Sequence, residues 1–152
     1  MSDALDVSLR LVKAQTALVR RFDSRLGALY GVSLADFLVL LHLGRAEGGR
    51  MRRVDLAGAL GLTASGVTRG LAPLERIGLV ERETDARDAR VAYAALTDAG
   101  RERLAHALKA AEQVAADVFG APEWADGDLG ELGGLLTRLG GAGLPEDHAP
   151  QA

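Results

Sequence analysis

The spacing of apolar residues predicts a mainly helical chain that begins with one long helix. Over residues 5–30, apolar side chains recur every three or four positions, which is the period of one helix face. They are Leu5, Leu9, Val12, Val19, Phe22, Leu26 and Leu29. Gly31 is placed to end this helix, because glycine readily adopts the left-handed conformation of a C-cap. A second helix is expected over residues 34–45, with Ser33 as its N-cap.

Two shorter helices and a pair of extended runs follow. The first helix is expected over residues 54–60 and is ended by Gly61. The second, which Thr63 is placed to cap, runs to about residue 77 and should bury Val67, Leu71, Leu74 and Ile77 on one face. The extended runs at 79–84 and 91–96 enclose a short charged loop, so they are expected to form a β-hairpin.

The chain closes with two more helices and an acidic tail. Thr97 is placed to cap a long helix over residues 98–119, and Pro122 prevents its continuation. A last helix is expected over 126–139, where four glycines make it weak alone, so it must dock against something. Residues 141–152 are rich in glycine, proline and acids and are expected to be flexible. The fold class is therefore mainly α, of the α+β kind.

The amino-acid composition and the residue spacing exclude several kinds of function. The chain has 152 residues, the size of one domain, and no cysteine, which excludes disulfides, thiolate catalysis and cysteine-based zinc sites. His42, His106 and His148 are far apart and show no metal-ligand spacing, and no nucleophile–base pair or phosphate loop stands out. We expect no metal, no cofactor and no enzyme activity. The start lacks a signal-peptide pattern and no apolar run reaches about 18 residues, so a cytoplasmic protein without membrane contact is expected.

Charge is divided unevenly along the chain, although the net charge is only −3. Residues 45–76 carry six arginines against three acids, a net of +3. Residues 112–152 carry eight acids against one arginine, a net of −7. One end of the molecule can therefore face a polyanion while the other end remains acidic.

The helix beginning at Thr63 has the features of a DNA-reading helix. A helix, a glycine-containing turn, a second helix and a hairpin occur in the order of a winged helix-turn-helix, in which the second helix enters the major groove. Ser65, Thr68 and Arg69 lie in its first two turns, opposite the apolar face. Arginine can contact guanine through two hydrogen bonds, whereas serine and threonine suit phosphates or either base type. The simpler interpretation is that these are ordinary surface residues near a helix start.

The predicted hairpin tip is the second candidate DNA contact. It carries Arg87 and Arg90 together with Asp85 and Asp88, and the aspartates are expected to orient the arginines through ion pairs. An arginine at such a tip can enter a narrow minor groove, where the negative potential is enhanced. The alternative is a solvated turn whose salt bridges contribute little to stability.

The motifs of this segment resemble the MarR family of bacterial transcription regulators. The resemblance rests on the segments Leu60-Gly61-Leu62-Thr63-Ala64-Ser65-Gly66-Val67-Thr68-Arg69, Leu74-Glu75-Arg76-Ile77-Gly78-Leu79-Val80-Glu81-Arg82, Asp85-Ala86-Arg87-Asp88-Ala89-Arg90 and Leu96-Thr97-Asp98-Ala99-Gly100. The motif-rich part covers about residues 35–104. PadR-type regulators share the hairpin and the Leu-Thr motif after it, but they lack a long leading helix.

The resemblance implies a homodimer with one DNA-binding lobe in each subunit, gripping a pseudo-palindromic inverted repeat in double-stranded DNA. Residues 1–33 and 98–140 would form dimerisation helices, and residues 34–97 the winged lobe. The two apolar end stripes also favour a dimer on physical grounds, because so small a chain has little else against which to bury them. The candidate DNA-binding residues are Arg53, Thr63, Ser65, Thr68, Arg69, Arg76, Arg87 and Arg90. Of these, Arg53 and Arg76 would contact phosphates.

The resemblance also implies a repressor that small phenolic or aromatic acids release from DNA. Nothing in the sequence identifies such an effector, and Trp124 is expected to serve in packing or at an interface. His42 is expected to be a partly buried helix residue. Besides the PadR-like alternative, the chain could be a winged-helix module that binds protein and has lost its DNA role, which its low net charge would suit.

Overall fold

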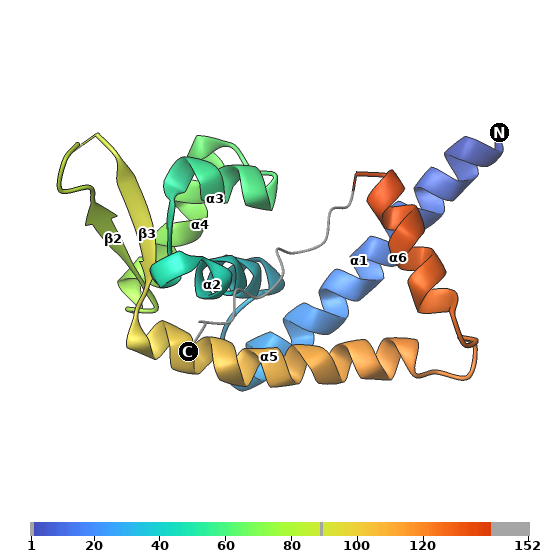
Figure 1. The fold of residues 1–152 in the computed structure, drawn as a ribbon. Helices are drawn as coiled ribbons and strands as arrows, with labels where there is room; N and C mark the ends of the chain where they lie inside the picture. The colour runs from blue at the N-terminus through green and yellow to red at the C-terminus, as the bar shows by residue number, and fades with distance from the viewer. Residues whose placement is uncertain (1, 89, 141–152) are drawn as a thin grey trace.

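The computed structural model describes residues 2–88 and 90–140, and the predicted flexible tail lies outside them. The fold is mainly helical with one small sheet, as predicted (Figure 1). In chain order the elements are α1 (Asp3–Tyr30), α2 (Leu34–Arg45), the 3-10 turn η1 (Glu47–Gly49), β1 (Arg50–Arg52), α3 (Arg53–Leu60), α4 (Ala64–Arg76), β2 (Val80–Thr84), β3 (Ala92–Leu96), α5 (Asp98–Phe119) and α6 (Asp128–Arg138).

The elements form a compact lobe with a helical arm beside it. Helices α2, α3 and α4 and the β2–β3 hairpin gather at one end, while α1 and α5 extend away from them (Figure 1). Helices α1 and α5 form the arm, where they pack against each other, and they connect it to the lobe. At the far end of α5, the Trp124 and Phe119 rings meet edge to face with centroids 4.9 Å apart, which confirms the packing role expected of Trp124.

Caps at the helix ends confirm the predicted boundaries. Ser33 and Asp36 form a capping box at the start of α2, each side chain accepting a backbone N–H of the other. Thr63 and Thr97 cap α4 and α5 by accepting a backbone N–H three residues on. Gly61 ends α3 with a φ of 65°, a left-handed conformation that other residues rarely adopt, and this fixes the tight turn into α4.

The sheet contains a strand that the sequence pattern did not reveal. Its order is β1-β3-β2, and β1 pairs antiparallel with β3. Three residues, Arg-Met-Arg, are too few to show the alternation that identifies a strand, so β1 is defined by its partner. Arg50 of β1 lies over the Tyr93 ring and donates to Glu83 of β2 at 2.8 Å, which ties the three strands together.

The core of the lobe is built around α2. This helix buries six side chains, and α4 adds Val67, Leu71 and Leu74 as predicted. Ile77 was predicted to join them, and this is wrong, because its side chain is 57% exposed. Ile77 is the C-cap of α4, and at 100° per residue it lies well to one side of the line of Val67, Leu71 and Leu74 just before the chain turns at Gly78.

A close contact locks the start of α5 against the end of α4. The Thr97 hydroxyl donates to the Gly78 carbonyl at 2.7 Å, and the Thr97 N–H donates to the Leu79 carbonyl. A Cβ at Gly100 would lie 2.0 Å from the Leu79 carbonyl oxygen, so this position requires glycine. The Leu-Thr-Asp-Ala-Gly motif is therefore the joint between α4 and the arm.

His42 lies in the core, as expected. It is the one buried polar or charged side chain among the described residues. Burial, and to a smaller extent the charge of Arg45, lowers the pKa of His42 below its usual value, which favours a neutral imidazole.

Over residues 2–88 and 90–140, no single helix is long and apolar enough to cross a bilayer, and only the pair α1 and α2, bent by 77°, passes that test together.

The arm leaves two apolar stripes uncovered. Helix α6 has no buried residue at all, although its leucines follow helical spacing. The N-terminal half of α1 is similarly open. Large apolar side chains exposed on these two helices are Leu5, Val7, Leu9, Leu11, Val12 and Leu29 of α1, and Leu129, Leu135 and Leu136 of α6.

Candidate nucleic-acid interface

Helix α4 presents a polar face away from the core. Ser65, Thr68 and Arg69 are all exposed, as the sequence predicts, while Val67 between them is buried. At 100° per residue, Ser65 and Arg69 point directly away from the buried face. Thr68 lies on the flank, turned toward α3 and the wing. The three predicted contacts therefore do not share one direction.

The hydroxyl groups at the start of α4 are already engaged. Thr63 Oγ1 accepts the Gly66 N–H at 3.1 Å and lies 3.2 Å from Ser65 Oγ. The Thr68 hydroxyl donates to the Ala64 carbonyl at 3.0 Å. Thr68 consequently offers a methyl group and oxygen lone pairs to a ligand, rather than a donor for a phosphate.

The two arginines of α4 have side-chain N–H groups that no described residue engages. Arg69 and Arg76 are exposed and make no hydrogen bond or ion pair with any residue in the described part of the chain. A guanidinium presents a fork of N–H donors that matches either a guanine edge or a phosphate. Arg69 lies in the second turn of α4 and Arg76 at its last residue, and both point away from the buried face.

Contacts within the protein do not explain Gly70, and those at Gly66 involve only the turn before α4. A Cβ at Gly70 would meet open space, and one at Gly66 would touch only Thr63 and Leu62 of the preceding turn. Close packing against α3, one of two reasons considered for these glycines, is therefore absent. Each glycine costs on the order of 1 kcal/mol relative to alanine in a helix interior. The open surface they leave on α4 is available to a ligand.

The wing is the hairpin of β2 and β3, and its two aspartates have different roles. Asp88 accepts from the Arg90 guanidinium at 3.0 and 3.2 Å, as expected, and these bonds with the Arg90 N–H lower the pKa of Asp88. Asp85 was expected to pair with an arginine, but its Oδ1 accepts the backbone N–H groups of Arg87 and Asp88 instead. The Arg87 side chain is exposed and has no partner among the described residues.

Arg53 lies where the sequence placed it but in a different environment. At the start of α3, its Nη2 donates to Glu75 of α4, and its side chain is only 17% exposed. The Arg53 Nε is buried and has no partner among the described residues. Arg53 therefore joins α3 to α4 within the protein, and this bond limits its freedom to reach a phosphate.

A hollow between α3, α4 and the wing went unnoticed in the sequence. It has a volume of about 340 Å³ and a largely apolar lining that includes Val54, Ala64, Val91 and Ala92. Thr68 also faces it, with Arg52, Arg53 and Arg90 at its sides. Val54 is 69% exposed although it is apolar. Arg82 of β2, exposed and without a described partner, is a further cation that the sequence did not single out.

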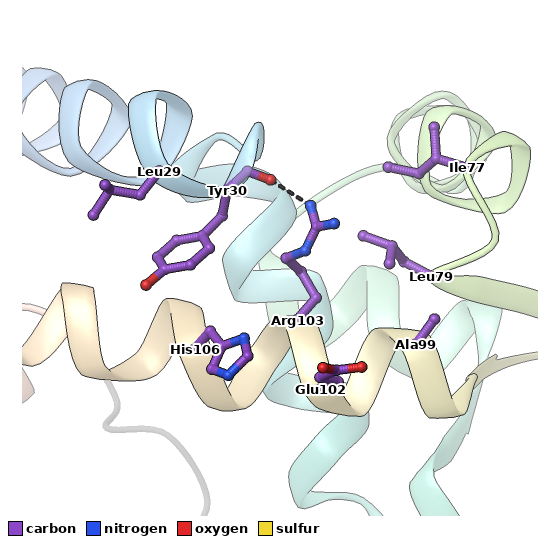
Figure 2. Close-up of a pocket in the computed structure, with 8 residues that line it drawn as sticks. All are labelled: Leu29, Tyr30, Ile77, Leu79, Ala99, Glu102, Arg103 and His106. Carbon is purple, nitrogen blue, oxygen red and sulfur yellow. Dashed lines mark hydrogen bonds between the residues drawn. The ribbon is translucent and has the colours of Figure 1, made fainter.

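A second hollow lies where the arm joins the lobe (Figure 2). It has a volume of about 470 Å³ and lies between the ends of α1 and α4 and the start of α5. Arg103 of α5 donates to the Tyr30 carbonyl at the end of α1, and the Tyr30 ring stacks on His106 with centroids 6.2 Å apart. Leu29 and Ile77 stand at its edges. We call it the joint cleft.

This geometry defines a winged helix-turn-helix protein. Two helices meet at a glycine turn, the second presents an outward arginine, and a hairpin with an arginine tip follows it. No group of three or more His, Asp and Glu side chains in the described chain is placed to hold a metal ion.

Comparison with known proteins names the family. The model of the MarR family matches residues 30–91, which include α2, α3, α4 and β2 of the winged lobe but end before β3. This match supports the resemblance that the motifs carry to the MarR family over the PadR-like alternative. A comparison with curated protein sequences gave no match.

Solved structures of known regulators are similar to this chain over about nine-tenths of its length. AbsC from Streptomyces coelicolor is 28% identical with a TM-score of 0.74, over 92% of this chain and 94% of that one. Sco3205 from the same organism, solved in complex with DNA, is 23% identical with a TM-score of 0.84, over 92% and 88% of the two chains. BpsR of Bordetella bronchiseptica, whose DNA binding is regulated by 6-hydroxynicotinic acid, is 23% identical with a TM-score of 0.78, over 89% and 98%.

Proposed function

We propose that this protein is a homodimeric, sequence-specific DNA-binding regulator that represses transcription from a pseudo-palindromic operator. The observation that carries the proposal is the pair of free arginines, Arg69 on α4 and Arg87 on the wing. Arg76 and Arg82 of the lobe are likewise without a described partner, but Arg69 and Arg87 alone combine this with a place on the outward face of α4 or at the tip of the wing. The protein would act in the cytoplasm, beside the chromosome, and without catalysis.

Specific binding to DNA is tested with the region upstream of the protein's own coding sequence. Mobility shift should show a complex that an equal mass of scrambled DNA does not compete away. Because phosphate contacts release counterions, six contacts would weaken binding by about a thousandfold between 50 and 200 mM salt. Equal binding to scrambled DNA, or no binding at low salt, would favour the protein-interaction module instead.

The exposed stripes of α1 and α6 support the dimer. A soluble monomer rarely leaves so many neighbouring leucines and valines open to water. Association of two copies through these helices would bury both stripes at once. Two-fold symmetry would then set two α4 helices about one DNA turn apart, which matches an inverted repeat.

The joint cleft is the place where we propose that a small aromatic acid acts. A carboxylate there could bind the remaining N–H groups of Arg103, and an aromatic body could lie against Leu29 and Ile77. Because the cleft touches both α4 and the arm, a ligand in it would bias the angle between them. BpsR, a similar structure, is regulated by such an acid.

Ligand release is checked with benzoate, 4-hydroxybenzoate and 6-hydroxynicotinate. At least one of these acids should lower the affinity of the wild-type protein for the operator. The same acid should lower the affinity of the Arg103→Gln variant much less. Arg101→Gln is the matched control, since Arg101 pairs with Asp98 and lies outside the lining. If none of the acids alters DNA affinity, or if Arg103→Gln responds as the wild type does, this assignment of the cleft is wrong.

A further inference from the structure

The hollow between α3, α4 and the wing combines features that do not suit a protein core. Its walls include an exposed valine and three small apolar groups, yet arginines stand along its sides. Val54, at 69%, is the most exposed large apolar side chain of the lobe. Val54 occupies the first turn of α3, where no described side chain covers it. An apolar surface framed by cations calls for a partner with an apolar edge and negative charge.

The geometry of DNA decides what must pass through this hollow. A reading helix occupies the major groove while the wing reaches the neighbouring minor groove. Those two grooves are separated by one sugar–phosphate strand. If α4 and the wing bind in this way, that strand has to run between them, and the hollow lies between them.

The chemistry of the lining matches a sugar–phosphate strand. Deoxyribose presents C–H groups, which pack against Val54, Val91 and the Ala64 methyl group. Thr68 adds a methyl group, because its hydroxyl hydrogen is donated to the Ala64 carbonyl. Phosphates on either side of the sugar would meet Arg52 and Arg90 at the sides of the hollow.

We infer that this hollow seats one sugar–phosphate strand of each operator half-site, and that Val54 packs against a deoxyribose. The inference rests on the proposed DNA-binding function and adds to it an apolar contact with the backbone. It also provides discrimination between sugars, since a ribose at the seated nucleotide would bring a 2′-hydroxyl against Val54. A hydroxyl desolvated without a partner is unfavourable.

A valine contact and an arginine contact differ in their response to salt. Val54→Ala should weaken operator binding about five- to tenfold, the effect of losing two partly buried methyl groups, with an unchanged salt slope. Arg87→Ala should instead lower that slope by about two, roughly one for each half-site of the dimer. Leu108→Ala is the matched control, because Leu108 of α5 is 36% exposed but lies outside both the hollow and the joint cleft, and the affinity of this variant should equal that of the wild type. The melting temperatures of all three variants should stay close to that of the wild type.

Single-ribose substitution locates the contact on the DNA. A duplex operator is prepared with one deoxyribose at a time replaced by ribose, and wild-type affinity is measured for each. At one nucleotide per half-site, ribose should lower the affinity severalfold. Threonine has the size of valine and offers a hydroxyl group, so Val54→Thr should restore the affinity at that nucleotide alone. Failure of the wild type to bind any selected DNA would refute the DNA-binding function itself. Tight binding of the wild type with the same affinity at every ribose position would contradict the proposed contact at Val54, as would equal affinities of Val54→Ala and the wild type. Either result would leave the DNA-binding function intact.

Discussion

Arg69→Ala should reduce the affinity of the dimer for its operator by two orders of magnitude or more. A bidentate arginine–guanine contact contributes about 1–3 kcal/mol of discrimination, and a dimer loses this contact in both half-sites. Because Arg69 is exposed and has no partner in the described chain, its removal leaves no buried group unpaired. Fluorescence anisotropy with a labelled operator would measure the loss, and the melting temperature should remain unchanged.

The loss should be confined to specific binding. Affinity for unrelated DNA depends on phosphates and should fall far less in Arg69→Ala, so the ratio of specific to non-specific binding collapses. Arg138→Ala is the control for charge alone, because Arg138 lies in α6, outside the lobe. Retained discrimination in Arg69→Ala would mean that α4 does not read bases through this residue.

Leu9→Asp and Leu136→Asp should each convert the dimer into monomers. Both leucines are exposed on the single chain, so an aspartate at either site is tolerated there. In the proposed dimer the same carboxylates would be buried without a partner, at a cost of several kcal/mol. Sedimentation velocity should show the monomer, and far-UV circular dichroism should show unchanged helix content.

Loss of the dimer should also weaken operator binding strongly. Two linked lobes gain from effective concentration, often by 10² to 10⁴, and a monomer loses this gain. Leu62→Asp is the matched control for sedimentation, because Leu62 is 48% exposed in the turn before α4 and away from both stripes. A dimer that survives both changes would place the interface elsewhere on the molecule.

Local sequence signals were sufficient for most of the fold. Ser33, Thr63 and Thr97 are cap residues whose hydroxyls accept the N–H three positions on, so they marked the starts of α2, α4 and α5 correctly. Gly31 and Gly61 marked two helix ends for the same local reason. Such signals depend on neighbours in the chain, and they can be read without knowing the fold.

Features that depend on tertiary contacts could not be predicted from the sequence. Strand β1 exists only because β3 pairs with it, and Arg53 is held by Glu75, which is 22 positions away. The hollow beside Val54 requires α3, α4 and the wing to be in place before it exists. The glycines of α6 predicted a weak helix that must dock, and because none of its residues is buried in the single chain, that docking stays a prediction.

Selection of bound DNA from a random pool tests the central claim most directly. The wild-type protein should enrich an inverted repeat whose half-site centres lie about one helical turn, roughly 34–36 Å, apart. Each half-site should contain one invariant guanine, and that guanine should lose its enrichment when the selection is repeated with Arg69→Ala. A pool that shows no inverted repeat, or the same enriched guanine with Arg69→Ala, would contradict a dimer that reads DNA through α4.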